Sequence, residues 1–239
     1  MRILTEPARL DKLLKTVLIH KQKSLLDTII GEFTPKGVVF KDMKLEVAAI
    51  HAVYSPKYFL EYESVDSENV PLTASLMDML GQGFKDEKVT LMTSEGHLVL
   101  KGSKETYNEL LTEAEKGEFV IKLQNTDFGF VPEKEPTVRV LLNVEDLNLP
   151  TAEKYRFDCD GKDLSVSIKD IGEYTKTFKP SKAPTLGELN VTFDGSFFQQ
   201  MMSNMTGEVW VSMTEGGVVF SQKTKDFCLT YLLSSLSEE

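Results

Sequence analysis

GEVWVSMTEGGVVF, which spans Gly207 to Phe220, is the segment that most constrains the architecture of this 239-residue chain. Apolar and polar residues alternate up to an acidic–glycine turn, and a second apolar strand follows, which is the pattern of a β-hairpin. The preceding segment, Ser196–Met205, has the length and apolar spacing of one short helix. Together the two segments predict a helix that leads into a hairpin.

The same arrangement recurs along the chain. Each occurrence has a turn glycine between two strand-like segments, and the glycines follow one another at intervals of roughly 60 residues; they are Gly37, Gly96, Gly161 and Gly217. The first three hairpins are expected within Ile30–Phe40, Val89–Leu100 and Tyr155–Val166. Four copies of a strand–helix–strands repeat are therefore predicted, although an unrelated α+β protein with several hairpins would give a similar pattern.

Hydrophobic spacing places the helices. Leu10, Leu13, Leu14, Val17 and Leu18 recur at helical spacing and predict an amphipathic helix from Ala8 to His20, opened by Pro7. A second helix is marked by Leu72, Leu76, Met79 and Leu80, and a third, from Val144 to Leu149, is cut short by Pro150.

The remaining segments are read as strands and loops. A strand is expected at Phe119–Leu123 and a loop at Pro180–Pro184, while Tyr107–Leu111 fits either a helix or a strand. The segment 124–136, QNTDFGFVPEKEP, combines polar residues, a glycine and two prolines, which is typical of a linker. It divides the chain into an N-terminal domain, 1–123, a connector, 124–136, and a C-terminal domain, 137–239.

Composition excludes several classes of protein. The chain has no apolar run long enough to cross a bilayer and no signal-peptide pattern, so an intracellular protein is expected, in the cytoplasm or nucleoid, the nucleus or a host cell, and not a secreted one. Its two cysteines, Cys159 and Cys228, do not form a disulfide framework. A formal charge of −10 means that nucleic acid could be bound only if the 27 Lys and Arg are segregated onto one face.

No catalytic motif can be assembled. The three histidines, His20, His51 and His97, are far apart, and no His/Cys pair has zinc-ligand spacing. Gly81–Gln82–Gly83 ends a helix and does not follow a strand, so it does not fit a dinucleotide-binding loop. We therefore expect a protein without enzymatic activity, cofactor or metal.

Three segments resemble the DNA sliding clamps of the proliferating cell nuclear antigen type. They are the opening, LDKLLKTVLI followed by FTPKGVVFKDM; the domain junction, FVIKLQNTDFGFVPEKEP; and the end of the chain, where Tyr231–Leu232–Leu233 precedes an acidic tail. The chain departs from the family at Lys44, where Asp is usual, at Val47, which comes one residue early, and at Ser234, which replaces a proline. It therefore resembles a divergent member.

The resemblance implies an α+β fold of two similar domains whose helices line a ring and whose antiparallel sheets form its outside. Such a ring is a homotrimer through which double-stranded DNA passes without being read, and it tethers DNA polymerase after a clamp loader places it. The DNA-facing residues implied for this chain are Lys12, Lys15, Lys21, Lys23, Lys85, Lys88, Gln199, Gln200 and Asn204. Because the fourth helix offers amides in place of charge, a weak salt dependence is expected.

Partner proteins of this family dock a short motif with aromatic and aliphatic anchors. In this chain the resemblance implies a pocket lined by Met43, Val47, Phe128, Phe130, Val131, Pro132, Tyr231, Leu232 and Leu233. An apolar cluster in a polar linker fits such a site, although the two phenylalanines could simply hold the linker against the sheets.

Three alternatives remain open. The chain could be a monomeric or dimeric processivity factor of the same fold, or one subunit of a hetero-oligomeric clamp. It could be a protein-interaction scaffold that never meets DNA, or an enzyme whose site the sequence conceals.

Overall fold

The computed structural model describes residues 1–21, 23–44, 47–82, 84, 87–111, 123–126, 129–168 and 174–236, with the backbone alone for residues 82, 123, 125–126 and 129–132. The chain divides into two compact units. The first holds Met1–Asp42, His51–Glu118 and Thr224–Phe227, and the second holds Met43–Ile50, Phe119–Lys223 and Cys228–Glu239. The division into domains at 1–123 and 137–239 stays a prediction.

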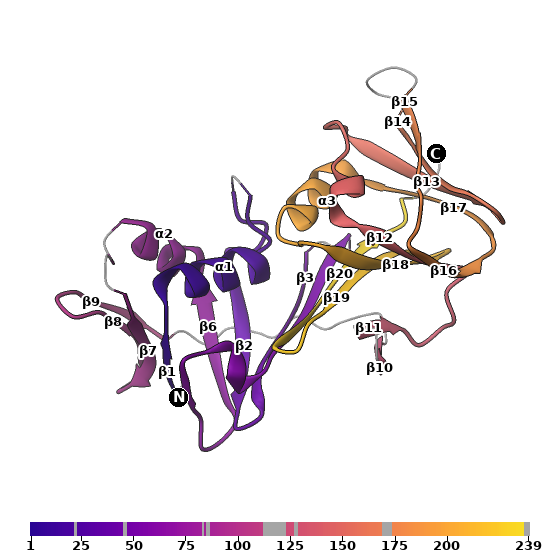
Figure 1. Ribbon diagram of the computed structural model, residues 1–239. Helices are drawn as coiled ribbons and strands as arrows, with labels where there is room; N and C mark the ends of the chain where they lie inside the picture. The colour runs from indigo at the N-terminus through magenta and orange to yellow at the C-terminus, as the bar shows by residue number, and fades with distance from the viewer. Residues whose placement is uncertain are drawn as a thin grey trace. The chain divides into compact units, whose positions relative to one another are not determined.

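Among its described residues, the first unit contains two helices and nine strands. In chain order they are β1 (Arg2–Thr5), α1 (Pro7–Val17), β2 (Thr28–Thr34), β3 (Gly37–Lys44), β4 (Ala48–Tyr54), a short 3₁₀ turn η1 (Pro56–Tyr58), β5 (Glu61–Glu63), β6 (Glu68–Thr73), α2 (Ala74–Gln82), β7 (Val89–Ser94), β8 (His97–Lys101) and β9 (Thr106–Leu110); β3 and β4 also contribute residues to the second unit. One sheet has the order β5-β1-β7-β8-β9, and the other strands follow the order β4-β3-β2-β6. Helices α1 and α2 lie side by side (Figure 1).

Besides the residues of β3 and β4, the second unit contains a small hairpin of β10 (Leu123–Thr126) and β11 (Gly129–Pro132). There follow β12 (Val138–Asn143), η2 (Val144–Leu147), β13 (Lys154–Asp160), β14 (Leu164–Ile168), β15 (Tyr174–Thr177), β16 (Lys182–Leu186), β17 (Glu188–Asp194), α3 (Gly195–Met202), β18 (Glu208–Thr214), β19 (Gly217–Lys223) and β20 (Phe227–Ser234). The strands follow the orders β16-β12-β18-β19-β20 and β15-β14-β13-β17.

The two units have the same topology. Taken in chain order, β1, β5, β7, β8 and β9 correspond to β12, β16, β18, β19 and β20, and β4-β3-β2-β6 corresponds to β15-β14-β13-β17. Helix α2 connects β6 to β7 as α3 connects β17 to β18, and the short η2 takes the place of α1. The predicted fold of two similar α+β halves, each with two repeats, is confirmed.

All four predicted turn glycines lie in hairpin turns. Their φ angles are 126° at Gly37, 77° at Gly96, 87° at Gly161 and 148° at Gly217. Positive φ is strained for residues with a Cβ, so glycine is the natural choice at these positions. The spacing of glycines that indicated the repeats thus reflects a backbone requirement of each hairpin.

Other sequence predictions need correction. The helix predicted to reach His20 ends at Val17, and the one predicted to reach Met205 ends at Met202. Leu72 belongs to strand β6, which the sequence analysis missed. The segment 106–110 is a strand, and most of 119–123 lies outside the described residues.

The loop predicted at Pro180–Pro184 is also wrong in part, because β16 begins at Lys182. Proline is tolerated at a sheet edge when its nitrogen faces outward. Pro184 lies in β16, an edge strand, opposite the register shift between Arg139 and Leu141 of β12, and such irregular edge positions accommodate proline.

Aromatic side chains form the core of the second unit. Phe157, Phe193, Phe198 and Phe220 are fully buried, and their ring centroids lie 5.0–6.5 Å apart. Helix α3 supplies Phe198 and begins at an Asp194 side chain that accepts hydrogen bonds from Ser196 N and Phe197 N. This cap fixes the start of the helix that connects the two sheets of the unit.

Candidate nucleic-acid and partner-protein surfaces

Helix α1 presents lysines on the side opposite its core residues. Leu10, Leu13, Leu14 and Val17 are buried, whereas Lys12 is exposed. Lys15 is half-buried and its Nζ lies 2.7 Å from Asp11 Oδ2. A surface ion pair at this spacing contributes only about 0.3–0.5 kcal/mol to stability. Asp11 therefore lowers the net positive charge of the helix surface but does little to fix the Lys15 side chain.

A tight turn follows α1 and carries two more lysines. His20 N donates to Lys15 O, and a β-bridge joins His20 to Ser24. Lys21 and Lys23 lie between the bridged residues, and both are exposed. The first unit therefore places Lys12, Lys21 and Lys23 on one continuous piece of chain.

The segment after α2 contributes less. Lys88 is exposed just before β7, and Lys85 lies outside the described residues. On α2 itself the exposed side chains are Ser75 and Asp78. The second helix of this unit therefore adds a negative charge to the helical surface and no positive one.

The amides predicted on α3 take part in internal bonding. Gln199 Nε2 donates to Leu149 O at 3.0 Å and to the Tyr155 hydroxyl at 2.7 Å. Asn204 Nδ2 donates to Gln200 O at 2.9 Å, which closes the end of the helix. The structure therefore gives these two amides a structural role. Gln200 is half-buried, and its role as a DNA-facing residue stays a prediction.

Replacing Gln199 by Ala tests that role. The change removes the hydrogen bonds that Gln199 donates to Leu149 O and to the Tyr155 hydroxyl, so we expect a loss of about 1–3 kcal/mol in the free energy of unfolding. Ser203→Ala, at the exposed end of the same helix, should change it by less than about 0.5 kcal/mol. Urea unfolding followed by tryptophan fluorescence measures both. Equal stability of the two variants would contradict the structural role.

Part of the predicted partner pocket is assembled in the second unit. Ala49, Val219 and Leu232 form a buried apolar cluster against which Met43 packs. Ser234 N donates to Val47 O at 2.8 Å, which brings the segment 43–50 beside the end of β20. Three of the nine predicted positions, Met43, Val47 and Leu232, are thus brought together.

Tyr231 and Leu233 are not brought to the same face. Leu232 pairs with Val219, whereas Tyr231 pairs with Phe220, a member of the aromatic core. Neighbouring side chains of a strand point to opposite faces, and both Tyr231 and Leu233 are fully buried. Their side chains therefore lie on the face opposite Leu232, and their place in the pocket stays a prediction.

The connector supplies the remaining predicted positions. Phe128 lies outside the described residues, and for Phe130, Val131 and Pro132 the backbone alone is described, as strand β11. Strand β11 pairs with β10 and contacts β19, which carries Val219. The backbone of the connector therefore runs next to the strand that contributes to the apolar cluster, as a shared binding surface would require.

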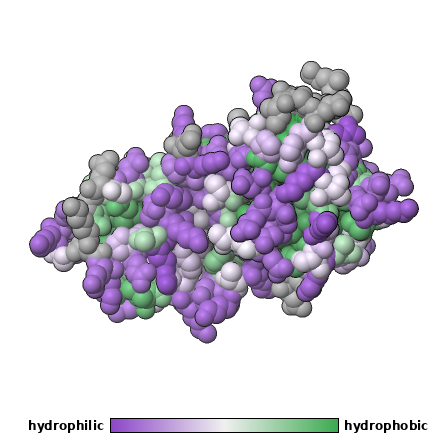
Figure 2. Space-filling model, turned by 45° about the horizontal axis from the view of Figure 1, so that its top comes forward, coloured by the Kyte–Doolittle hydropathy of each residue, from purple (hydrophilic) through white to green (hydrophobic). Residues whose placement is uncertain are grey.

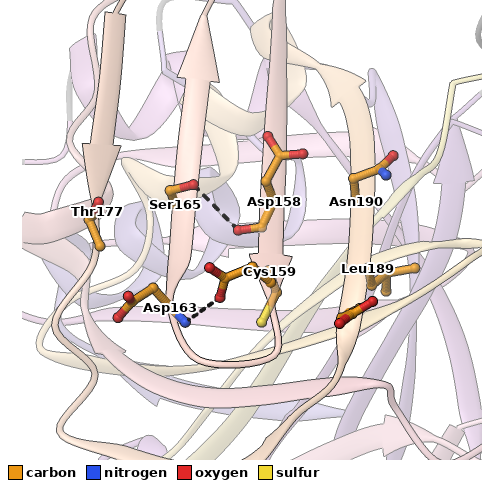
Figure 3. A pocket seen from close by; sticks show the side chains of 9 residues that line it. Asp158, Cys159, Asp163, Ser165, Thr177, Leu189 and Asn190 are labelled. Atoms are coloured by element: carbon orange, nitrogen blue, oxygen red, sulfur yellow. Dashed lines mark hydrogen bonds between the residues drawn. The ribbon is translucent and has the colours of Figure 1, made fainter.

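An acidic pocket of about 680 Å³ lies at the β13–β14 turn (Figure 3). Asp160 Oδ1 accepts from Lys162 N and Asp163 N, and these bonds lower the pKa of its carboxyl group. Asp158 Oδ1 accepts from Arg156 Nε at 2.8 Å. The Asp160 carboxylate therefore stabilises the turn, and the Asp158 carboxylate pairs with Arg156. Among the described lining residues we identify no nucleophile–base pair beside them.

The histidines do not converge on a site. His51 is buried, and burial, with a contribution from Lys41, lowers its pKa to about 4, so the ring is neutral at pH 7. His20 and His97 lie in separate turns beside Ser24 and Glu95. Within the described parts of the chain, no three His, Cys, Asp or Glu side chains are grouped to hold a metal.

The surface and the helices give two further observations. Figure 2, in which the top of Figure 1 comes forward, shows hydrophilic side chains over most of the visible face. None of the described helices has the length and hydropathy needed to cross a membrane.

Comparison with known proteins identifies the fold. No protein-family model and no curated protein sequence matches the chain. Solved structures do match. A. fulgidus PCNA bound to the C-terminal region of FEN-1 has a TM-score of 0.79 and 13% sequence identity, and the match covers 100% of this chain and 99% of that one. Proliferating cellular nuclear antigen from Entamoeba histolytica has a TM-score of 0.77 and 11% identity, with 99% and 98% of the two chains covered, and the PCNA2–PCNA3 complex from Sulfolobus tokodaii has a TM-score of 0.76 and 15% identity, with 100% of each chain covered. The chain has the sliding-clamp fold over its whole length.

Proposed function

We propose that this chain is a sliding clamp, an intracellular processivity factor without enzymatic activity whose copies close into a ring around duplex DNA and tether DNA polymerase. The observation that carries the proposal is the likeness to clamp structures, which covers the whole chain at TM-scores of 0.76–0.79. The internal duplication supports it, because a ring built from similar units can surround DNA without reading its sequence.

The sheet edges support assembly from identical copies. Exposed edges are usually protected by prolines, charges or short length. Strand β6 carries Pro71, β16 carries Pro184, and the three-residue β5 carries two glutamates. At the β17 edge, Thr192 O accepts from Leu236 N. Strands β9 and β15 also end a sheet. Neither contains a proline, and the one charged residue of each, Glu109 and Lys176, bonds within the chain to Thr73 and to Asp146 O, so these two edges are the candidates for pairing.

Both open edges present backbone groups outward. Leu111 N donates to Gly96 O and Phe178 N donates to Leu164 O, which fixes the alternation of bonds along β9 and β15. The N–H and C=O groups of Asn108 and Thr175 therefore point away from their own sheets. Leu110, at the end of β9, is 65% exposed and adds apolar surface to this edge.

Pairing β9 of one copy with β15 of the next would use both edges at once. These strands are the counterparts of β20 and β4, and residues of the segment 43–50 already bond to β20 within the second unit. A head-to-tail contact of this kind makes a closed ring when its rotation closes. We propose a homotrimer, with the partner motif docking at the Met43–Leu232 cluster and an ATP-driven loader placing the ring.

Threading onto DNA with blocked ends tests the proposal without a loader. A linear duplex is fixed to beads at one end, incubated with the protein, and then closed at the free end with a bound antibody. The protein should resist a high-salt wash on closed DNA and leave when the duplex is cut. Light scattering should give three times the chain mass. Equal loss from open and closed DNA would overturn the ring, and a mass of one or two chains would favour the alternative assemblies.

A further inference from the structure

The acidic pocket opens beside one of the two open edges. Four carboxylates line it, those of Asp158, Asp160, Asp163 and Glu188, and none of its described lining residues is Lys or Arg. Asp160 and Glu188 lie directly opposite each other on β13 and β17, and like charges at such positions destabilise a sheet. The lining residue from β15 is Thr177 (Figure 3). Negative charge is therefore gathered next to the strand that the proposed ring pairs with another copy.

The chain contains a template for that pairing. Strands β20 and β4, the counterparts of β9 and β15, are neighbours in one sheet. Ser234 N donates to Val47 O within the second unit, and Ser55 N donates to Asp226 O within the first. Along antiparallel strands one chain advances as the other recedes, and by this count both bonds have the same register. That register can be transferred to the two open edges once their equivalent residues are known.

Hairpin turns relate β9 to β20. His97 pairs with Leu110, and Gly217 pairs with Ser234. Since His97 and Gly217 each begin a strand directly after the equivalent turn, Leu110 corresponds to Ser234.

The same comparison relates β15 to β4. Gly37, which closes its turn, lies against the backbone of Tyr54 and of the residue after it, so the next strand residue, Val38, is opposite Tyr54. In the second unit, Leu164 is likewise one residue past the closing pair of its turn, and its oxygen accepts from Phe178 N. Phe178 therefore corresponds to Tyr54, and both are buried aromatic residues.

Transferred to β9 and β15, the register places Thr106 opposite Thr175. Both residues direct their backbone groups outward, as a hydrogen-bonded pair requires. The neighbouring pairs are Tyr107 with Tyr174 and Glu105 with Lys176. Threonine pairs, aromatic pairs and pairs of opposite charge all stabilise sheets at directly opposed positions. The side chains of the two edges therefore match in a register that was taken from other strands.

The turn before β9 then comes beside the acidic pocket. Gly102 N donates to Glu105 O, which closes this turn, and the exposed Lys104 lies within it. In the transferred register Lys104 is level with Thr177. Neighbouring strands are about 4.8 Å apart, so β14, which Asp163 precedes, is about 10 Å away across the sheet. Two extended side chains cover much of this distance, and salt at about 0.1 M leaves attraction between charges at this range.

We propose that the acidic pocket of each copy receives Lys104 of the next copy, with Asp163 as its nearest carboxylate, in the register that sets Thr106 opposite Thr175. This inference rests on the proposed function, which requires a ring but not this register. The occupant is a second copy of this chain, because its basic turn complements the charge of the pocket and is continuous with the paired edges.

Disulfide trapping tests the register. The double variant Thr106→Cys, Thr175→Cys should give bands of two and three chain masses on a denaturing gel after oxidation with copper–phenanthroline. The Cα atoms of a hydrogen-bonded pair lie about 5.5 Å apart, a distance that a disulfide spans. Thr106→Cys with Thr177→Cys is two residues out of register, beyond that reach, and should remain a single chain. Crosslinking of the second pair and not of the first would overturn the register.

Charge reversal tests the occupant of the pocket. Lys104→Glu should weaken each contact about fivefold, the upper range for a cross-strand charge pair, and the three-contact ring by about 100-fold. Asp163→Lys in the same chain should restore assembly to within about threefold. Lys57→Glu, an exposed reversal before β5 at the opposite edge of the β9 sheet, should assemble like the wild type. Light scattering over a dilution series measures all four chains.

The outcomes separate this inference from the proposed function. A wild-type trimer in which Lys104→Glu has no effect, or in which Asp163→Lys fails to restore assembly, would overturn the inference and leave the ring in place. A wild-type chain that remains a monomer would overturn both.

Discussion

Gly217→Ala is expected to lower the free energy of unfolding by about 3 kcal/mol or more, the range of severe single substitutions. The backbone at Gly217 has a φ of 148°, and a Cβ built there would lie 2.1 Å from Leu233 O. That oxygen belongs to β20, which pairs with β19 along its whole length. Relief of the overlap therefore requires the two strands to separate at the turn. For a chain of this size the melting temperature should fall by roughly 6–12 °C.

Gly216→Ala is the matched control for this substitution. Gly216 is exposed in the same turn, its φ is not in the left-handed region, and the nearest atom to a built Cβ is Thr214 Oγ1 at 3.8 Å. Its stability should stay within about 0.5 kcal/mol of the wild type. Thermal unfolding followed by circular dichroism compares the two variants, and similar melting temperatures would contradict the predicted overlap.

The repeat could be predicted from the turn glycines, but the space available for a Cβ at each of them could not. Gly37 has the same surroundings as Gly217, with a built Cβ 2.1 Å from Tyr54 O, whereas Gly96 has no atom within 4 Å. The sequence shows the same residue in all three turns. The difference depends on which strand crosses the turn, and that is a property of tertiary structure.

The exposure of residues on the candidate surfaces could be predicted where it follows from local spacing, but their long-range hydrogen bonds could not. Helical periodicity correctly placed Lys12 on the exposed side of α1, because that pattern is local. The internal bonding of Gln199 depends on Leu149 and Tyr155, 50 and 44 residues away, and no local pattern reveals it. The separation of Leu232 from its two neighbours follows from strand alternation, a signal that the sequence contained.

If the chain forms the proposed ring, Asn108→Pro is expected to abolish its assembly while leaving the subunit folded. The N–H of Asn108 points away from β8, so proline removes no bond of its own sheet but takes one donor from the open edge. The ring of the proline would also obstruct the approach of a neighbouring strand. Light scattering at micromolar concentration should change from three chains to one, and circular dichroism should stay the same. Thr175→Pro, on the proposed opposing edge, should do the same.

Asn69→Pro separates this effect from a general intolerance of proline at sheet edges. Ala74 N donates to Asp27 O, so the alternation along β6 directs the N–H of Asn69 outward as well, and this edge already contains Pro71. This variant should therefore remain a trimer. If Asn69→Pro dissociated the ring and Asn108→Pro did not, the subunit contact would lie at β6 and the ring would close through other strands. Because the three substitutions make the same chemical change at outward-facing positions, only the location of the interface can distinguish them.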